Sequence, residues 1–208
     1  MTSALSSEHF GTHSFGGQPT NLREPAWPPR QAENPNCRRI VDAAVDILRQ
    51  GEALLGTLTV ETYTTKLPVV FNGSIGGHYR HCLDHFASLV RGLDAGLVDY
   101  DHRERDPRLE QDPEFALGLT CQLRTTLELL EPGTLAASVS ARSEVSYDHG
   151  DSPVTGSSVG RELAYAIAHA IHHYALISVM ARLLNATLPP HFGIAPSTVA
   201  HQKTAASH

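Results

Sequence analysis

The stretch AHAIHHYALI, residues 168–177, decides the fold that we predict, because it places three histidines in a sequence that otherwise reads as a buried helix. At 100° per residue, Glu162, His169 and His173 fall in one narrow sector of that helix, together with apolar side chains. Both imidazoles therefore face the interior of the protein, where a helix ordinarily carries leucine or alanine. A helix with this face needs other helices to cover it.

Apolar residues at helical spacing predict the partners of this helix. The four predicted long helices run from an Asn34 cap to Leu58, from a Ser74 cap to Leu93, from Pro113 to Pro132-Gly133, and from Ser157 or Ser158 to the residue before Pro189-Pro190. We therefore predict an all-α chain that forms a four-helix bundle. Alternating residues in 134–158 favour either a short hairpin or a long crossover before the last helix.

The chain is expected to hold one domain with two tails, because 208 residues suffice for one sizeable core. Residues 1–33, rich in Ser, Thr, Gly and Pro, are expected to form an extended or disordered N-terminal arm. Residues 34–190 form the bundle, and residues 191–208 form a C-terminal tail partly packed on it. Within the bundle, residues 59–73 are expected to be an extended loop and residues 94–112 a solvated connection.

Composition narrows the classes of partner. The net charge is −6, from 16 basic and 22 acidic residues, and no basic stripe is interleaved with aromatic residues, so we expect no nucleic-acid partner. No signal peptide or transmembrane run is recognised, so we expect a cytoplasmic protein with no membrane partner. The three cysteines are widely spaced and never form a Cys-x-x-Cys pair, which makes reduced thiols the expectation.

The histidines point to a polar site inside the bundle. The i, i+4 pair His169 and His173 sets two ring nitrogens side by side, and the second helix adds His78, His81 and His85. Burying several neutral imidazoles without partners costs free energy, so either a divalent metal ion or a hydrogen-bonded polar core must satisfy their nitrogens. The helical wheel favours His78 or His85 as the third ligand and puts His81 toward the edge, so periodicity leaves the third ligand open.

In motif order and spacing, SIGGHYRHCLDH (residues 74–85) and HAIHHYALI (residues 169–177) resemble the DinB/YfiT-like superfamily of four-helix-bundle proteins. The resemblance implies that His81, His169 and His173 bind one divalent ion, Zn, Ni or Fe(II), with open coordination positions. It implies a metal-dependent hydrolase or a transferase of a low-molecular-weight thiol, acting on an unidentified small-molecule substrate. The alternative is a non-catalytic metal-binding or stress-associated dimeric bundle.

Neighbouring polar residues complete the predicted site. Glu162 is expected to act as a general base or to hold the second nitrogen of a ligand, and the alternative is a glutamate favoured by the helix dipole. Asp84 and His85 are expected to support the ligands without binding the ion. The stretch from Tyr100 to Arg105 is expected to be either a lid or a solvated charged loop. The apolar third helix leads us to expect a homodimer.

Overall fold

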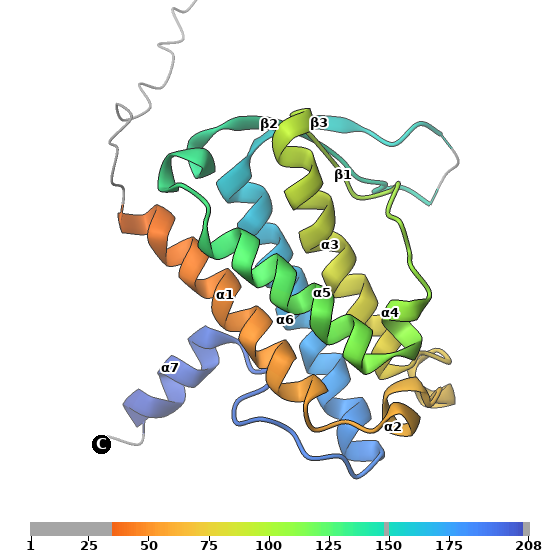
Figure 1. Cartoon of the computed structure of the whole chain (residues 1–208). Helices are drawn as coiled ribbons and strands as arrows, with labels where there is room; N and C mark the ends of the chain where they lie inside the picture. Colours follow the sequence, from red (N-terminus) through yellow and green to blue (C-terminus); the bar gives the residue numbers. More distant parts are fainter. Residues whose placement is uncertain (1–34, 148–149, 206–208) are drawn as a thin grey trace, which may run out of the picture. The chain divides into compact units, whose positions relative to one another are not determined.

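Four long helices frame the protein. The computed structural model describes residues 35–147 and 150–205, so the arm predicted for residues 1–33 lies outside the described residues (Figure 1). The long helices are α1 (Pro35–Leu55), α3 (Ile75–Ala95), α5 (Pro113–Glu128) and α6 (Val159–Leu183). Helix α1 packs along α5 and α6, and α3 packs along α6 and α5. The four predicted long helices are therefore present.

Capping side chains fix where these helices begin. The Ser74 hydroxyl accepts a hydrogen bond from the Gly77 amide at 3.0 Å, and the Ser158 hydroxyl accepts one from the Arg161 amide at 3.3 Å. Each bond satisfies an amide that has no partner inside its own helix. The cap predicted at Ser74 is confirmed, and of the two serines considered for the last helix it is Ser158 that caps.

The prediction of an all-α chain is wrong in one respect, because the helices carry a small sheet. Strands β1 (Leu97–Asp99), β2 (Ser138–Arg142) and β3 (Val154–Ser158) lie in the order β1-β2-β3. Strands β2 and β3 form an antiparallel hairpin, one of the two alternatives that the sequence left open, and β1 joins β2 in parallel, with Val98 opposite Ala141. The chain is thus mainly α, with a three-stranded sheet.

Strand β1 lies in the stretch that was predicted to be a solvated connection. It packs closely on α3, because a Cβ added to Gly92 would lie only 2.8 Å from Cγ2 of Val98. Val98 is fully buried in this contact. A glycine in the helix and a valine in the strand therefore bring the backbone after α3 back against the helix.

Short helices and turns occupy the other connections and the segment after α6. They are α2 (Val60–Thr64), the 3-10 turn η1 (Pro68–Val70), α4 (Arg108–Gln111), the 3-10 turn η2 (Pro132–Ala136) and α7 (Pro196–Ala205). The prediction of an extended loop over residues 59–73 is wrong where α2 forms, because the Thr59 hydroxyl caps the Thr62 amide. Beyond α6, Phe192 is buried and stacks on Tyr174, so this part of the tail packs on the helices as expected.

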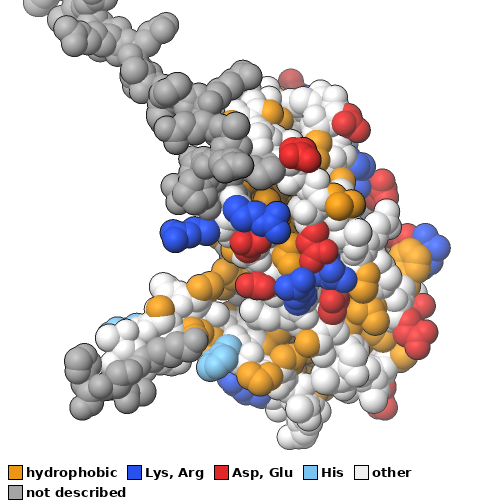
Figure 2. Space-filling view, turned by 60° about the vertical axis from the view of Figure 1, so that its left-hand side comes forward, with side chains coloured by type: hydrophobic (Ala, Val, Ile, Leu, Met, Phe, Trp, Pro, Cys, Tyr) orange, Lys and Arg blue, Asp and Glu red, His pale blue; other side chains and the backbone are white. Residues whose placement is uncertain are grey.

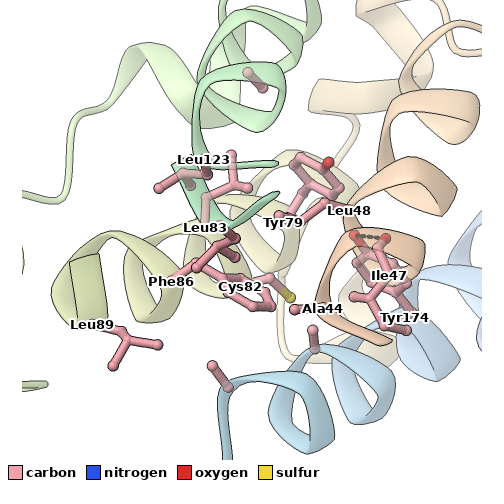
Figure 3. Packing of buried hydrophobic residues seen from close by; sticks show 14 of the residues in the cluster. Ala44, Ile47, Leu48, Tyr79, Cys82, Leu83, Phe86, Leu89, Leu123 and Tyr174 are labelled. Atoms are coloured by element: carbon pink, nitrogen blue, oxygen red, sulfur yellow. Dashed lines mark hydrogen bonds between the residues drawn. The ribbon is translucent and has the colours of Figure 1, made fainter. Parts of the chain in front are cut away.

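The core lies between the long helices (Figure 3). It includes Ala44, Ile47 and Leu48 of α1, Tyr79, Cys82, Leu83, Phe86 and Leu89 of α3, Leu123 of α5 and Tyr174 of α6. The buried hydroxyl of Tyr174 donates a hydrogen bond to the Ile47 carbonyl at 3.2 Å. Removal of these side chains from water holds α3 and α6 against α1.

Helix α6 is also long and apolar enough to cross a membrane, judged by length and composition alone. The mean hydropathy of its most apolar 18-residue window is 1.3, and 39% of that window is buried within the protein. The core helix of a soluble protein meets the same criterion, so this property is a weak indication on its own.

Acidic and basic side chains lie side by side on one face of the protein (Figure 2). Arg38 pairs with Asp42 on α1, and Arg49 pairs with Asp46 and with Glu128 of α5. Charges of both signs therefore alternate along α1, and one ion pair joins α1 to α5.

Candidate metal centre

Helices α3 and α6 bring three of the predicted ligands together. His81 comes from the second turn of α3, and His169 and His173 come from adjacent turns of α6. One ring nitrogen from each of the three residues lies within 4.8 Å of the other two. Nε2 of His81 lies 2.9 Å from Nε2 of His169. The three half-buried imidazoles thus converge on one point between two helices.

Two further histidines border these three. Nδ1 of His78 lies 3.0 Å from Nδ1 of His173, and the ring of His85 stacks on that of His169 with centroids 3.9 Å apart. The His85 Nδ1–H donates to the His81 carbonyl at 2.9 Å, which fixes the orientation of the His85 ring. We refer to the rings of His78, His81, His85, His169 and His173 as the histidine cluster. His172, by contrast, is exposed.

Crowding and burial keep the cluster neutral. Burial, followed by the neighbouring rings of His85, His173 and His169, lowers the pKa of His81 to about 2. Burial also lowers the pKa values of His85, His169 and His173 to about 4. At neutral pH these rings are therefore unprotonated, which is the state in which imidazole offers a lone pair to a metal ion.

The contact between His78 and His173 has a consequence for ligation. Two Nδ1 atoms 3.0 Å apart share one proton, so one ring donates and the other accepts. With the proton on Nδ1 of His173, the Nε2 lone pair of the same ring is available for a metal ion. His78 then holds His173 in the required tautomer.

Within the described residues, Tyr100 connects Glu162 to the cluster. Its carboxylate is buried and accepts hydrogen bonds from the Tyr100 hydroxyl at 2.8 Å and from the Ser157 hydroxyl at 2.5 Å. The Tyr100 ring stacks on His85, with centroids 5.1 Å apart. The hydrogen-bond partners of the Glu162 carboxylate among the described residues are thus two hydroxyls, and a general base or a glutamate favoured by the helix dipole remains a prediction for this residue.

Sequence reasoning missed Arg103. Its guanidinium donates a hydrogen bond from Nη1 to Nδ1 of His81 at 2.8 Å. Asp84 is buried next to the cluster on α3, where burial raises the pKa of its carboxyl while Arg103 and Arg80 act in the opposite direction. The only sequence feature that pointed to a role for Arg103 was the charged stretch from Tyr100 to Arg105. A solvated surface loop has the same composition, so this feature was not decisive.

Cys82, beside His81 in the sequence, points into the hydrophobic core (Figure 3). Burial raises the pKa of its thiol well above the usual range. This side chain is therefore a neutral, packed thiol, which argues against a nucleophilic role.

The fold and the cluster define a mainly α protein with a half-buried group of histidines between two long helices. No family model matches the chain, and no solved structure matches it. The chain is similar to FK506-binding protein 5 of Rhizopus delemar (strain RA 99-880), with 36% identity over 113 residues. The matched segment is 51% of this chain and only 28% of that protein, so the chain spans less than a third of the length of this curated relative.

Proposed function

We propose that the chain binds one divalent metal ion through His81, His169 and His173, and that its four long helices form a four-helix bundle of the DinB/YfiT-like type. The observation that carries the proposal is the convergence of three imidazole nitrogens within 4.8 Å. Imidazole nitrogens around a tetrahedral zinc ion lie about 3.3 Å apart, given Zn–N distances of about 2.0–2.1 Å. A small adjustment of side chains therefore converts the cluster into a ligand set.

The chemistry of the three imidazole nitrogens also fits a divalent metal ion. Three neutral imidazoles suit Zn, Ni or Fe(II), and they do not discriminate among these metals. A metal ion with three histidine ligands and open positions activates water or holds a thiolate or carbonyl group. This supports a metal-dependent hydrolase or a transferase of a low-molecular-weight thiol, acting on a small molecule. The similarity to FK506-binding protein 5 covers half of the chain and does not identify the reaction.

The surrounding residues orient the ligands. His78 holds His173 through the paired Nδ1 atoms, and His85 stacks on His169. Glu162 acts at a distance, because its carboxylate holds the Tyr100 hydroxyl, and the Tyr100 ring covers His85. We therefore propose that Glu162 positions the cluster and that it takes no proton from a substrate directly.

A second candidate is a non-catalytic protein whose histidines stabilise the helices. The observation that favours it is the pairing of ring nitrogens, His81 with His169 at 2.9 Å and His78 with His173 at 3.0 Å. Such pairs satisfy buried nitrogens without an ion.

Metal analysis of the full chain, purified without a histidine tag, separates the two candidates. We expect one equivalent of divalent metal per chain, and loss of that equivalent in each of the variants His81→Ala, His169→Ala and His173→Ala. The matched control is His201→Ala, because His201 is exposed on α7. A wild-type chain that takes up no Zn, Ni or Fe(II) on titration would refute the proposal, as would undiminished metal in all three variants.

A further inference from the structure

Arg103 stands out among the residues around the histidine cluster because its charge is left without an ionic partner. Its guanidinium is half-buried, donates to Nδ1 of His81 at 2.8 Å, and keeps a buried Nε that has no hydrogen-bond partner among the described residues. Other arginines nearby are paired: Arg80 with Glu110 at 3.0 Å and Arg91 with Glu104 at 3.4 Å. In residues 35–147 and 150–205, no carboxylate forms an ion pair with Arg103.

The hydrogen bond between Arg103 and His81 is incompatible with ligation of a metal ion by His81. A guanidinium has only donors, so Nδ1 of His81 must supply a lone pair and the proton of the neutral ring must sit on Nε2. If Nε2 becomes the ligand, the proton moves to Nδ1 and faces another donor. If Nδ1 becomes the ligand, its lone pair is used. In both cases Arg103 has to leave His81.

A released Arg103 retains a full charge and five N–H donors one imidazole ring away from the ligand nitrogens. We propose, on the basis of the metal site proposed above, that Arg103 then binds an oxyanion of the substrate, a carboxylate or a phosphate group, beside the three histidines that would hold the metal. The planar fork of a guanidinium matches both groups with two parallel hydrogen bonds. Arg103 thus defines the substrate class of the site as small anionic molecules.

The charged groups around Arg103 do not prevent its guanidinium from binding an anion. Asp84 is the carboxylate with the largest electrostatic effect on Arg103, followed among carboxylates by Asp101, and neither lies within ion-pair distance. Asp101 uses one oxygen to accept from the Glu144 amide at 2.9 Å. A turn of Arg103 toward Asp84 on metal binding is the competing outcome, and in that case the protein gains no anion site.

The test uses the full chain loaded with Co(II), whose visible absorption reports the ligands of the metal. Acetate and methyl phosphate are titrated separately against wild type, Arg103→Met and Arg105→Gln. Arg105 is the matched control, because it lies in the same loop and is exposed. We expect one of the two anions to bind wild type and Arg105→Gln alike, and to bind Arg103→Met at least about tenfold more weakly, the loss expected for a charged hydrogen-bonding partner. The anion that binds identifies the group.

Metal affinity, measured separately, keeps the two proposals distinguishable. Arg103→Met is expected to bind Co(II) at least as tightly as wild type, because the competing hydrogen bond is gone. A wild type that binds no Co(II) overturns the proposed function. A wild type that binds Co(II), with anion affinity that is absent or equal in wild type and Arg103→Met, overturns the role of Arg103 and leaves the metal site intact.

Discussion

Acidification of the metal-free chain tests the histidine cluster directly. The cluster forces several imidazoles into a neutral state, whereas the same imidazoles titrate near 6.5 in an unfolded chain. Below about pH 6.5 the imidazoles bind protons in the unfolded state, whereas the same imidazoles stay neutral in the folded state. The contribution of the cluster to the free energy of unfolding must therefore be constant above about pH 7 and must fall as the pH decreases from 6.5 toward 4.

The pKa values give the magnitude. For His85, His169 and His173, with pKa lowered from 6.5 to about 4, a change from pH 7.5 to 5.5 costs about 1.3 kcal/mol for each ring. His81, lowered to about 2, adds a similar amount. Full additivity would give about 5 kcal/mol, and solvent screening of the half-buried rings reduces this, so we expect a loss of about 2 to 4 kcal/mol. That is a large share of the stability of a typical domain.

The assay is urea unfolding followed by circular dichroism, with chelator present, at pH values from 7.5 to 4.5. The variant His85→Asn keeps a donor near Nδ1 for the His81 carbonyl but cannot bind a proton, so its pH dependence should be about a quarter weaker. The control His201→Gln removes an exposed histidine and should reproduce the wild-type slope. A free energy of unfolding that is the same at pH 7.5 and 5.5 would refute the description of the cluster as neutral and crowded.

Four further predictions concern metal, packing and assembly. Removal of bound metal by a chelator at pH 7.5 should lower Tm by several degrees, since metal that binds only the folded chain stabilises it, and equal Tm values with the metal demonstrably gone would exclude a structural role. Gly76→Ala should destabilise by about 1–3 kcal/mol in urea, because the new Cβ would collide with the backbone carbonyl of Glu110 and would lie 2.7 Å from the Tyr63 ring, whereas Gly118→Ala, with no neighbouring atom outside its own helix within 4 Å, should be neutral or stabilising. Tyr100→Phe should cost about 1–3 kcal/mol because it removes a donor from buried Glu162, with exposed Tyr147→Phe as the silent control. Light scattering at tens of micromolar should give the mass of a homodimer, and a monomer mass would contradict this.

Long helices were predictable because each combines a local start signal with many turns of periodic residues. Ser74 and Ser158 each mark the start of a helix with one capping side chain. The apolar stripes that follow run for about twenty residues. The five-residue helix α2 offers no such repetition. Its β-branched residues favoured an extended loop, while the cap at Thr59 and packing on α3 gave a helix.

The choice among the histidines of α3 was not predictable from periodicity, and the reason is geometric. A helical wheel ranks residues by how deeply they face the core, and by that measure His85, which is only 4% exposed, precedes half-buried His81. Which ring meets the two histidines of α6 depends on the relative rotation and height of the two helices. These are set by the packing of side chains along the whole interface. The family resemblance favoured His81, and one nitrogen of His81 lies within 4.8 Å of nitrogens of His169 and His173, while the ring of His85 also stacks on His169.

The contact of Arg103 with His81 could not be predicted from the sequence, and strand β1 could not be predicted for the same reason. Val98 and its neighbours form a strand because β2, some 40 residues later in the chain, pairs with them. A segment of three residues is too short to show the alternating pattern that predicts a strand. After the strand, the Asp99 carboxylate accepts from the amides of Asp101 and His102 and turns the chain. Arg142 of β2 binds the same carboxylate at 3.0 Å and fixes the turn to the sheet. The turn brings Arg103 back to His81, so the hydrogen bond between these two residues depends on a strand pairing that no local stretch of sequence encodes.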